Sequence, residues 1–234
     1  MSDRREQVAA GLSRVEQRIA DACRAAGRER DEVTLIVVTK FFPASDVRIL
    51  HDLGVREVGE NRHQEAAAKH EECADLSLRW HFIGHLQSNK AAAVGAWADV
   101  VQSVDRARLL PGLARAAHQR DVTLDVLVQV SLDPPAAGTG RSGVAPAEAV
   151  RLAEECAAAE GLALRGVMGV APLGGDPAEA FAELAEIWTQ VRERVPSATW
   201  VSAGMSGDLE QAVAAGATHV RVGSAVLGNR PAYQ

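Results

Sequence analysis

Short runs of β-branched and other apolar residues alternate with alanine-rich stretches along almost the whole chain. A run such as LIVVTK at 35–40 is short and rich in residues that favour buried strands. The stretches between such runs place apolar residues at three- and four-residue spacing, which is typical of amphipathic helices. This alternation predicts eight strands, at 35–40, 56–60, 79–84, 100–104, 124–131, 164–170, 199–203 and 219–223.

Helices are predicted before the first strand and after each of the first seven strands. In the N-terminal segment, Val8, Leu12, Val15, Ile19 and Ala22 recur at helical spacing. The remaining helices are predicted at 44–53, 62–73, 88–96, 106–120, 146–159, 177–194 and 208–215.

Eight strands that alternate with helices fit an open doubly wound sheet or a closed (β/α)8 barrel. The chain has 234 residues, and a typical barrel takes roughly 250. No GxGxxG sequence follows the first strand, so the dinucleotide-binding form of the open sheet has no support. We therefore predict an α/β fold with a single domain over 1–234, a (β/α)8 TIM barrel with an extra N-terminal helix.

Composition and charge narrow the class of protein. The net charge of −6 argues against a nucleic-acid or anionic-membrane partner, because such partners are bound through basic patches. No apolar run approaches the roughly 18 to 20 residues of a membrane span. Cys23, Cys73 and Cys156 lie far apart without CxxC spacing, which indicates reduced thiols. We expect a cytoplasmic protein, and we expect it to be a monomer.

Lys40, at the end of the first predicted strand, is one of only three lysines among 25 basic residues. Lys69 and Lys90 fall in polar segments that predict exposed helices, so arginine serves as the ordinary surface cation. A lysine differs from an arginine in that burial can remove its proton, which Schiff-base chemistry requires. The alternative for Lys40 is a strand-end lysine that reaches water or pairs with a carboxylate.

The loops after the last two predicted strands have the composition of a phosphate site. The segment 204–208 (GMSGD) leads into a predicted helix, and Gly223 and Ser224 follow the last strand. Glycine lets an anion approach the backbone, serine adds a hydroxyl donor, and a helix start offers unpaired amides. In TIM barrels these two loops frequently hold a phosphate. The alternative for 206–208 is an ordinary capped helix start.

Arg221 lies on the last predicted strand, where alternation directs it to one face of the barrel wall. A buried arginine needs a partner, and three possibilities stay open. It could pair with a carboxylate such as Glu60 or Asp105, face outward, or donate to a ring nitrogen of a bound cofactor.

Other polar residues lie near the carboxyl ends of strands. Asn61, His85 and Ser103 are in such positions, and Asn61 and His85 are candidates for hydrogen bonds to a ligand or for loop and helix capping. His81 and His85 have His-x3-His spacing, but their segment predicts a strand, so we predict no metal site. The Gly- and Pro-rich segment 133–145 is either a lid or an ordinary surface loop.

Several of these segments together resemble the pyridoxal phosphate homeostasis protein family, also called the YggS or PROSC family. The resemblance covers nearly the whole chain in order, and its most specific stretch is WHFIGHLQSNK at 80–90. The other matching segments are Lys40, 59–62 (GENR), 202–208 (SAGMSGD) and 221–224 (RVGS). Ser224 and Ala203 depart from the family, which often has threonine and methionine there, and serine keeps the hydroxyl.

The resemblance implies a fold like the barrel domain of alanine racemase, which is PLP fold type III. It implies that Lys40 forms the Schiff base with pyridoxal 5'-phosphate (PLP) and that Arg221 faces the pyridine nitrogen. Ser206, Gly207, Gly223 and Ser224 would hold the phosphate. The predicted cofactor-binding set is Lys40, Asn61, His85, Met205, Ser206, Gly207, Arg221, Gly223 and Ser224.

The predicted function is to hold PLP for buffering or for delivery to PLP-dependent apoenzymes, without robust turnover. The first alternative is an amino-acid racemase. Against it, an arginine donor leaves the ring nitrogen unprotonated and the ring a poorer electron sink, and Tyr233, the only tyrosine, stands at the end of the chain. The second alternative is a class I Schiff-base aldolase, which would show no visible absorption from the cofactor.

Overall fold

The eight predicted strands are all present, and they form one closed parallel barrel. The computed structural model describes residues 2–134 and 142–229. Each strand pairs with the next in the sequence, and the last pairs with the first, so the TIM-barrel prediction is confirmed. The strands are β1 Thr34–Val38, β2 Glu57–Glu60, β3 Arg79–Phe82, β4 Val100–Val104, β5 Leu124–Gln129, β6 Leu162–Met168, β7 Trp200–Ser202 and β8 His219–Val222.

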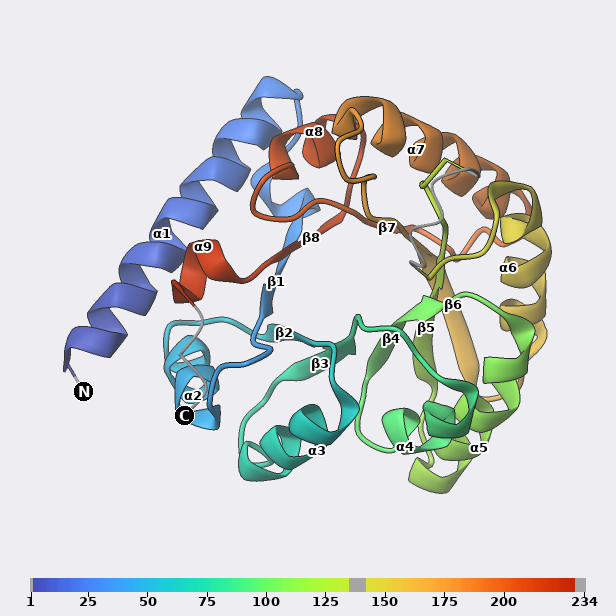
Figure 1. Cartoon of the computed structure of the whole chain (residues 1–234), viewed down its shortest axis with the longest axis horizontal. Helices are drawn as coiled ribbons and strands as arrows, with labels where there is room; N and C mark the ends of the chain where they lie inside the picture. Colours follow the sequence, from blue (N-terminus) through green and yellow to red (C-terminus); the bar gives the residue numbers. More distant parts are fainter. Residues whose placement is uncertain (1, 135–141, 230–234) are drawn as a thin grey trace.

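Helices surround the barrel wall (Figure 1). They are α1 Ser2–Ala25, α2 Ala44–Asp52, α3 His63–Glu72, α4 Ala91–Gly95, α5 Leu110–Arg120, α6 Ala149–Ala158, α7 Pro177–Arg194, α8 Leu209–Ala214 and α9 Ser224–Leu227. The predicted helices 88–96, 106–120 and 146–159 each begin with a single 3-10 turn, at Ser88–Lys90, Ala107–Leu109 and Pro146–Glu148. The short helix α9 was not predicted. Within the described ranges, no helix combines the length and the apolar composition that a bilayer crossing needs.

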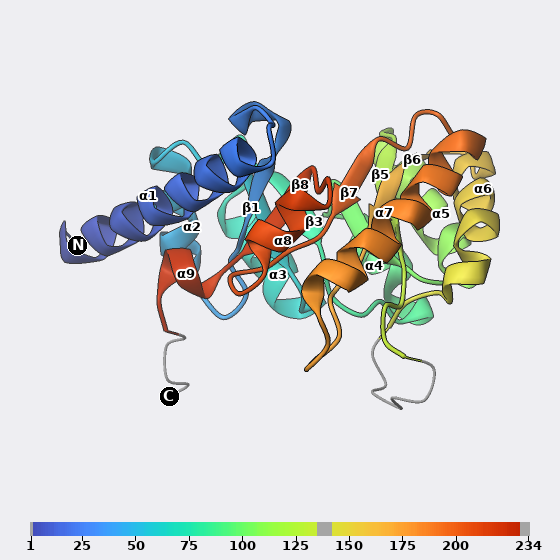
Figure 2. The same cartoon turned by 90° about the horizontal axis from the view of Figure 1, so that it is seen from above.

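The extra N-terminal helix α1 lies along α8 and α9 on the outside of the barrel, and Figures 1 and 2 agree on this placement. Its apolar positions Val8, Val15 and Ile19 are fully or almost fully buried. Gly11 permits close contact with α9, because a Cβ atom there would lie 2.1 Å from the carbonyl oxygen of Val226. The predicted amphipathic helix is confirmed, and it covers the last two helices of the barrel.

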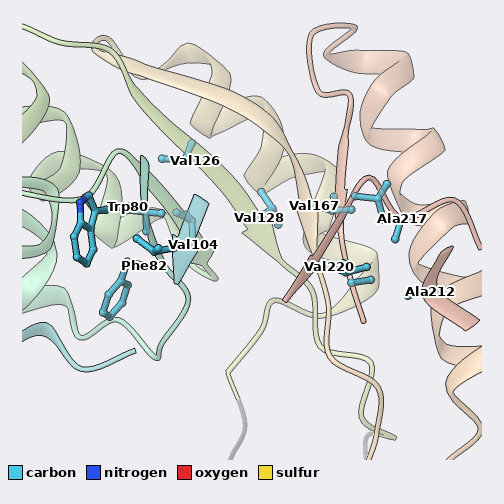
Figure 3. Packing of buried hydrophobic residues seen from close by; sticks show 14 of the residues in the cluster. Trp80, Phe82, Val104, Val126, Val128, Val167, Ala212, Ala217 and Val220 are labelled. Carbon is cyan, nitrogen blue, oxygen red and sulfur yellow. The ribbon is translucent and has the colours of Figure 1, made fainter. Parts of the chain in front are cut away.

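The strands direct alternate residues to the two sides of the wall. Outward-facing residues such as Val126, Val128, Val167 and Val220 belong to the main hydrophobic core between strands and helices (Figure 3). A small separate cluster of Val100, Leu127 and Met168 occupies the barrel interior. The interior also contains buried polar side chains from four strands, namely His81, Gln102, Ser202 and Arg221. The barrel is therefore packed by a mixed apolar and polar interior.

Ion pairs lie at the amino-terminal end of the barrel strands. Asp125 accepts hydrogen bonds from Arg79 and from Arg165 Nε, the latter at 2.6 Å. The Arg79 guanidinium also lies over the Trp200 ring, 4.8 Å from its centroid, and that ring packs against His219. These contacts cover the end of the barrel that lies opposite the carboxyl ends of the strands.

Candidate functional site

A cavity of about 290 Å³ lies at the carboxyl ends of the strands, next to β1, β7 and β8. Seven of the nine predicted cofactor-binding residues line it: Lys40, Met205, Ser206, Gly207, Arg221, Gly223 and Ser224. Val38, Phe42 and Ile83 supply apolar surface in the same cavity. Strands at opposite ends of the sequence form this site because β8 pairs with β1 and closes the barrel.

Lys40 lies two residues beyond the end of β1, whereas the sequence predicted it inside the strand. The chain turns there, because Phe42 donates its amide to Thr39 O at 3.0 Å and Phe41 adopts a left-handed φ of 71°. That conformation is uncommon for a bulky residue and costs conformational energy. The turn places the half-buried Lys40 in the cavity.

A buried ion-pair cluster holds both neighbours of Lys40. Lys69 Nζ donates to Thr39 O at 2.9 Å, to Glu60 Oε1 at 2.6 Å and to Glu65 Oε1 at 3.2 Å. Thr39 Oγ1 donates to Glu60 Oε1 at 2.6 Å, and the amide of Phe41 donates to Glu65 Oε1 at 2.5 Å. The cluster therefore connects β2 and α3 to the backbone on either side of Lys40.

The prediction that Lys69 is an exposed helical residue was wrong. Its exposed fraction is 4%, because α3 packs this side chain against the outward face of β2. Burial is the main reason that the pKa of Glu60 is raised, and the contacts with Lys69 and Thr39 oppose that shift. A lysine whose ammonium is held by two carboxylates is a poor nucleophile, so this arrangement favours Lys40 as the reactive amine.

The loop after β7 can present backbone amides to an anion. Gly204 adopts a φ of 87°, and the amide of Met205 donates to Asp208 Oδ1 at 2.5 Å. In the described part of the chain, no backbone carbonyl accepts the amides of Ser206 or Gly207. The space beside Gly207 is open, since nothing lies within 4 Å of a Cβ atom built there. These amides, with the Ser206 hydroxyl, form the anion-binding side of the cavity.

Gly223, after β8, lies against the end of β1. A Cβ atom at this position would lie 3.0 Å from Val38 O, so a larger residue would crowd the wall of the cavity. The following residue, Ser224, begins α9 and exposes its side chain. This close approach explains why the sequence has glycine where the last strand meets the first.

Arg221 is buried inside the barrel, and it lines the cavity from the side of the barrel interior. Its Nη1 donates to Ser202 Oγ at 2.6 Å and its Nη2 donates to Gly169 O at 2.8 Å. Neither contact is with Glu60 or Asp105, the carboxylates that its sequence position suggested as partners. Burial lowers the pKa of Arg221 to about 10, which the nearby Asp208 opposes, and the guanidinium stays protonated at neutral pH.

Asn61 and His85 line a neighbouring cavity of about 580 Å³, together with Arg62, His63 and Lys90. His85 Nδ1 is hydrogen-bonded to Ser142 Oγ. Their roles towards a cofactor stay predictions, because the structure does not bring them into the cavity of Lys40.

Ser103 lines neither of these two cavities. Ser103 is buried, and its Oγ has no hydrogen-bond partner among the described residues. The segment 133–145 includes residues 135–141, which lie outside the described residues, as does Tyr233.

Comparison with known proteins identifies the family. The model of the alanine racemase N-terminal domain family matches residues 12–231. The pyridoxal phosphate homeostasis protein of Mycobacterium tuberculosis is 43% identical over 97% of this chain and 95% of its own length. The chain belongs to the pyridoxal phosphate homeostasis protein family. The resemblance stated from its motifs is thereby confirmed.

Solved structures agree with this membership. PipY of Synechococcus elongatus without PLP superposes with a TM-score of 0.82, at 34% identity over 94% of this chain and 100% of its own. The PipY structure with PLP bound gives a TM-score of 0.79 at 32% identity. Alanine racemase of Clostridium difficile is 15% identical with a TM-score of 0.72, covering 97% of this chain and 58% of its own, and it supports the fold alone.

Within this homeostasis family member, sequence reasoning missed the residues that support the cavity from behind. Glu65 and Lys69 stand four positions apart on one helix, a spacing that could have indicated an ion pair. Nothing local pointed to Ser202 as the acceptor for Arg221, because the two residues are brought together by the pairing of β7 with β8.

Proposed function

We propose that this protein binds PLP and takes part in its homeostasis, by buffering the cofactor or delivering it to PLP-dependent apoenzymes. One observation carries the proposal: Lys40, the Ser206–Gly207 loop, Gly223, Ser224 and Arg221 line a single cavity. An amine, an anion-binding loop and a guanidinium at three sides of a small space match the aldehyde, the phosphate and the ring nitrogen of PLP. The relative PipY, which has been solved with PLP bound, supports the same ligand.

The residues present fit the cofactor in chemistry and in space. The open space beside Gly207 leaves room for a phosphate, and Ser206 and Ser224 add hydroxyl donors. PLP would supply an aldehyde, and the amine of Lys40 is the group that would hold it covalently. Arg221 donates from below and cannot accept a proton. Met205 lines the phosphate side, and Asn61 and His85 are proposed as further contacts.

We propose that the protein has no robust turnover. Electron withdrawal by PLP depends on protonation of its ring nitrogen, which a guanidinium donor does not supply. No observation favours the racemase or aldolase alternatives over the binding role. We further propose that residues 1–234 act as one domain and as a monomer, in the cytoplasm, where the buried thiols of Cys23, Cys73 and Cys156 would stay unpaired.

The test is an absorption spectrum of the purified protein with PLP, before and after borohydride reduction, followed by peptide mapping. We expect visible absorption that borohydride removes, with the phosphopyridoxyl group on Lys40. Lys40→Ala should abolish the absorption, whereas the matched control Lys90→Ala, at an exposed lysine, should keep it. Labelling mainly at Lys69 or Lys90 would overturn the site assignment, and the absence of a reducible adduct would overturn the function.

A further inference from the structure

A continuous series of hydrogen bonds crosses the barrel interior below the cavity. Arg221 Nη1 donates to Ser202 Oγ at 2.6 Å, and Ser202 Oγ donates to Gln102 Oε1 at 2.7 Å. Gln102 Nε2 lies 2.9 Å from His81 Nδ1, and His81 Nε2 lies 2.5 Å from Glu57 Oε2. The four links join β8, β7, β4, β3 and β2.

The first four members are buried, with exposed fractions of at most 4%, and the Glu57 side chain at the far end is 23% exposed. Each of these residues projects inward from its strand, so the series depends on the closed barrel. Polar side chains at such positions are costly unless every one is hydrogen-bonded. The series satisfies that condition from the cavity to the opposite end of the barrel.

The chemistry of Arg221 and the placement of the Gln102 amide together fix the direction of every bond in the series. A guanidinium can only donate, so Ser202 Oγ accepts from it and directs its own hydrogen to Gln102 Oε1. The amide nitrogen of Gln102 then faces His81 and donates to Nδ1. The ring proton of His81 is therefore on Nε2, where the acceptor is the Glu57 carboxylate, which can only accept.

The series can fix the orientation of the Arg221 guanidinium, but it does not conduct protons. A primary amide does not readily exchange a proton between its oxygen and its nitrogen, so Gln102 interrupts any proton path between Arg221 and Glu57. Arg221 donates to two uncharged acceptors, Ser202 Oγ and Gly169 O, which take two of its five N–H groups. The only carboxylate of the series stands four hydrogen bonds away.

We propose that Ser202, Gln102 and His81, with Glu57 at the far end, are positioning residues for Arg221. They hold the guanidinium so that its other N–H groups face the cavity, and the two hydrogen bonds that the structure describes for it go to uncharged acceptors. This inference rests on the proposed function, in which Arg221 faces the ring nitrogen of PLP. It adds residues from four other strands to the group of residues that sets how PLP is held.

The first test uses the wild-type protein without cofactor. Long-range 1H–15N NMR of the histidine side chains, with His81 identified by its loss in His81→Gln, reports which ring nitrogen carries the proton. We expect Nε2–H with an unprotonated Nδ1. In Gln102→Glu a carboxylate would accept from both Ser202 and His81, so both ring nitrogens should become protonated. A wild-type proton on Nδ1 would overturn the direction of the series.

The second test compares Gln102→Met, which breaks two links, with Val100→Ala, a neighbour on β4 that points into the same interior without joining the series. With PLP bound, Gln102→Met should show a shifted visible absorption. It should also release PLP about tenfold faster, which is the effect expected from the loss of one hydrogen bond to a charged group. Val100→Ala should change only thermal stability. Equal spectra and release rates in the two variants would overturn the inference.

If the wild-type protein itself formed no reducible adduct, the proposed function would fail instead, whereas the cofactor-free NMR result would still stand.

Discussion

The ammonium of Lys69 lies 2.6 Å from the carboxylate of Glu60, and both side chains are buried between β2 and α3. Glu60 has no exposed surface, and burial raises its pKa. The same ammonium donates to Thr39 O, immediately before Lys40. The ion pair therefore supports both the barrel wall and the turn that presents the reactive amine.

Replacing Lys69 with methionine should destabilise the protein by about 3–5 kcal/mol, the cost of leaving a buried carboxylate without its partner. The measurement is the free energy of unfolding from urea titration. Because Thr39 O also loses its donor, we expect Lys40 to react with PLP more slowly in this variant.

A matched variant separates the charge effect from loss of packing. In Lys69→Met combined with Glu60→Gln the buried charge is absent, so the double variant should recover part of the lost stability. A double variant less stable than Lys69→Met alone would contradict the interpretation of the pair as a buried charge that needs neutralisation.

The phosphate side of the cavity should depend on its two hydroxyl groups. In a variant with both Ser206→Ala and Ser224→Ala, each lost bond to a charged phosphate should cost about 1.5–3 kcal/mol of binding free energy. PLP retention after dialysis, followed by absorption, measures the effect. Ser197→Ala, at an exposed serine that does not line the cavity, is the control. Retention equal to that of the control would show that the hydroxyls do not bind the phosphate.

His219 should make the protein less stable in acid. Burial is the main reason that its pKa is lowered from 6.5 to about 3, and nearby His81, Arg79 and Arg221 lower it further. Between these values the unfolded chain binds a proton that the folded chain does not, so the unfolding free energy falls as the pH falls. The slope from this residue is at most about 1.36 kcal/mol per pH unit.

Urea titrations from pH 7 to pH 4 measure this slope. His219→Asn should flatten the decline, while His118→Asn, at an exposed histidine, should leave it unchanged. The slopes are compared, since losing the His219 ring contact with Trp200 also changes the absolute stability. Parallel declines in wild type and His219→Asn would rule out this histidine as the cause.

The protein loaded with PLP should not racemise alanine at an enzyme-like rate. Arg221 keeps the ring nitrogen unprotonated in our proposal, so removal of the α-proton gains little stabilisation. Chiral chromatography after incubation with L-alanine or with D-alanine measures the conversion. A kcat in the ordinary range of about 1 to 10³ s⁻¹ would favour the racemase alternative over the homeostasis role.

The repeated pattern of β-branched runs and alanine-rich stretches was enough to predict all eight strands and the barrel. Lys40 and the two small-residue loops after the last strands were also recognisable, because each depends on residues adjacent in the sequence. A glycine such as Gly223 at a strand end predicts, by itself, that a ligand can approach the backbone closely. The resemblance of the segments 80–90 and 221–224 to family motifs then identified PLP as the expected cofactor.

Only the tertiary structure decided the partners of the buried charges. Lys69 reads as a polar helical residue, and its burial depends on the face that α3 turns towards Glu60. The series from Arg221 to Glu57 exists because barrel closure brings the inward-facing residues of five strands together. Asn61 lines a neighbouring cavity although it follows a strand of the same barrel. Strand register and helix rotation set these contacts, and both are properties of packing between segments that are distant in the sequence.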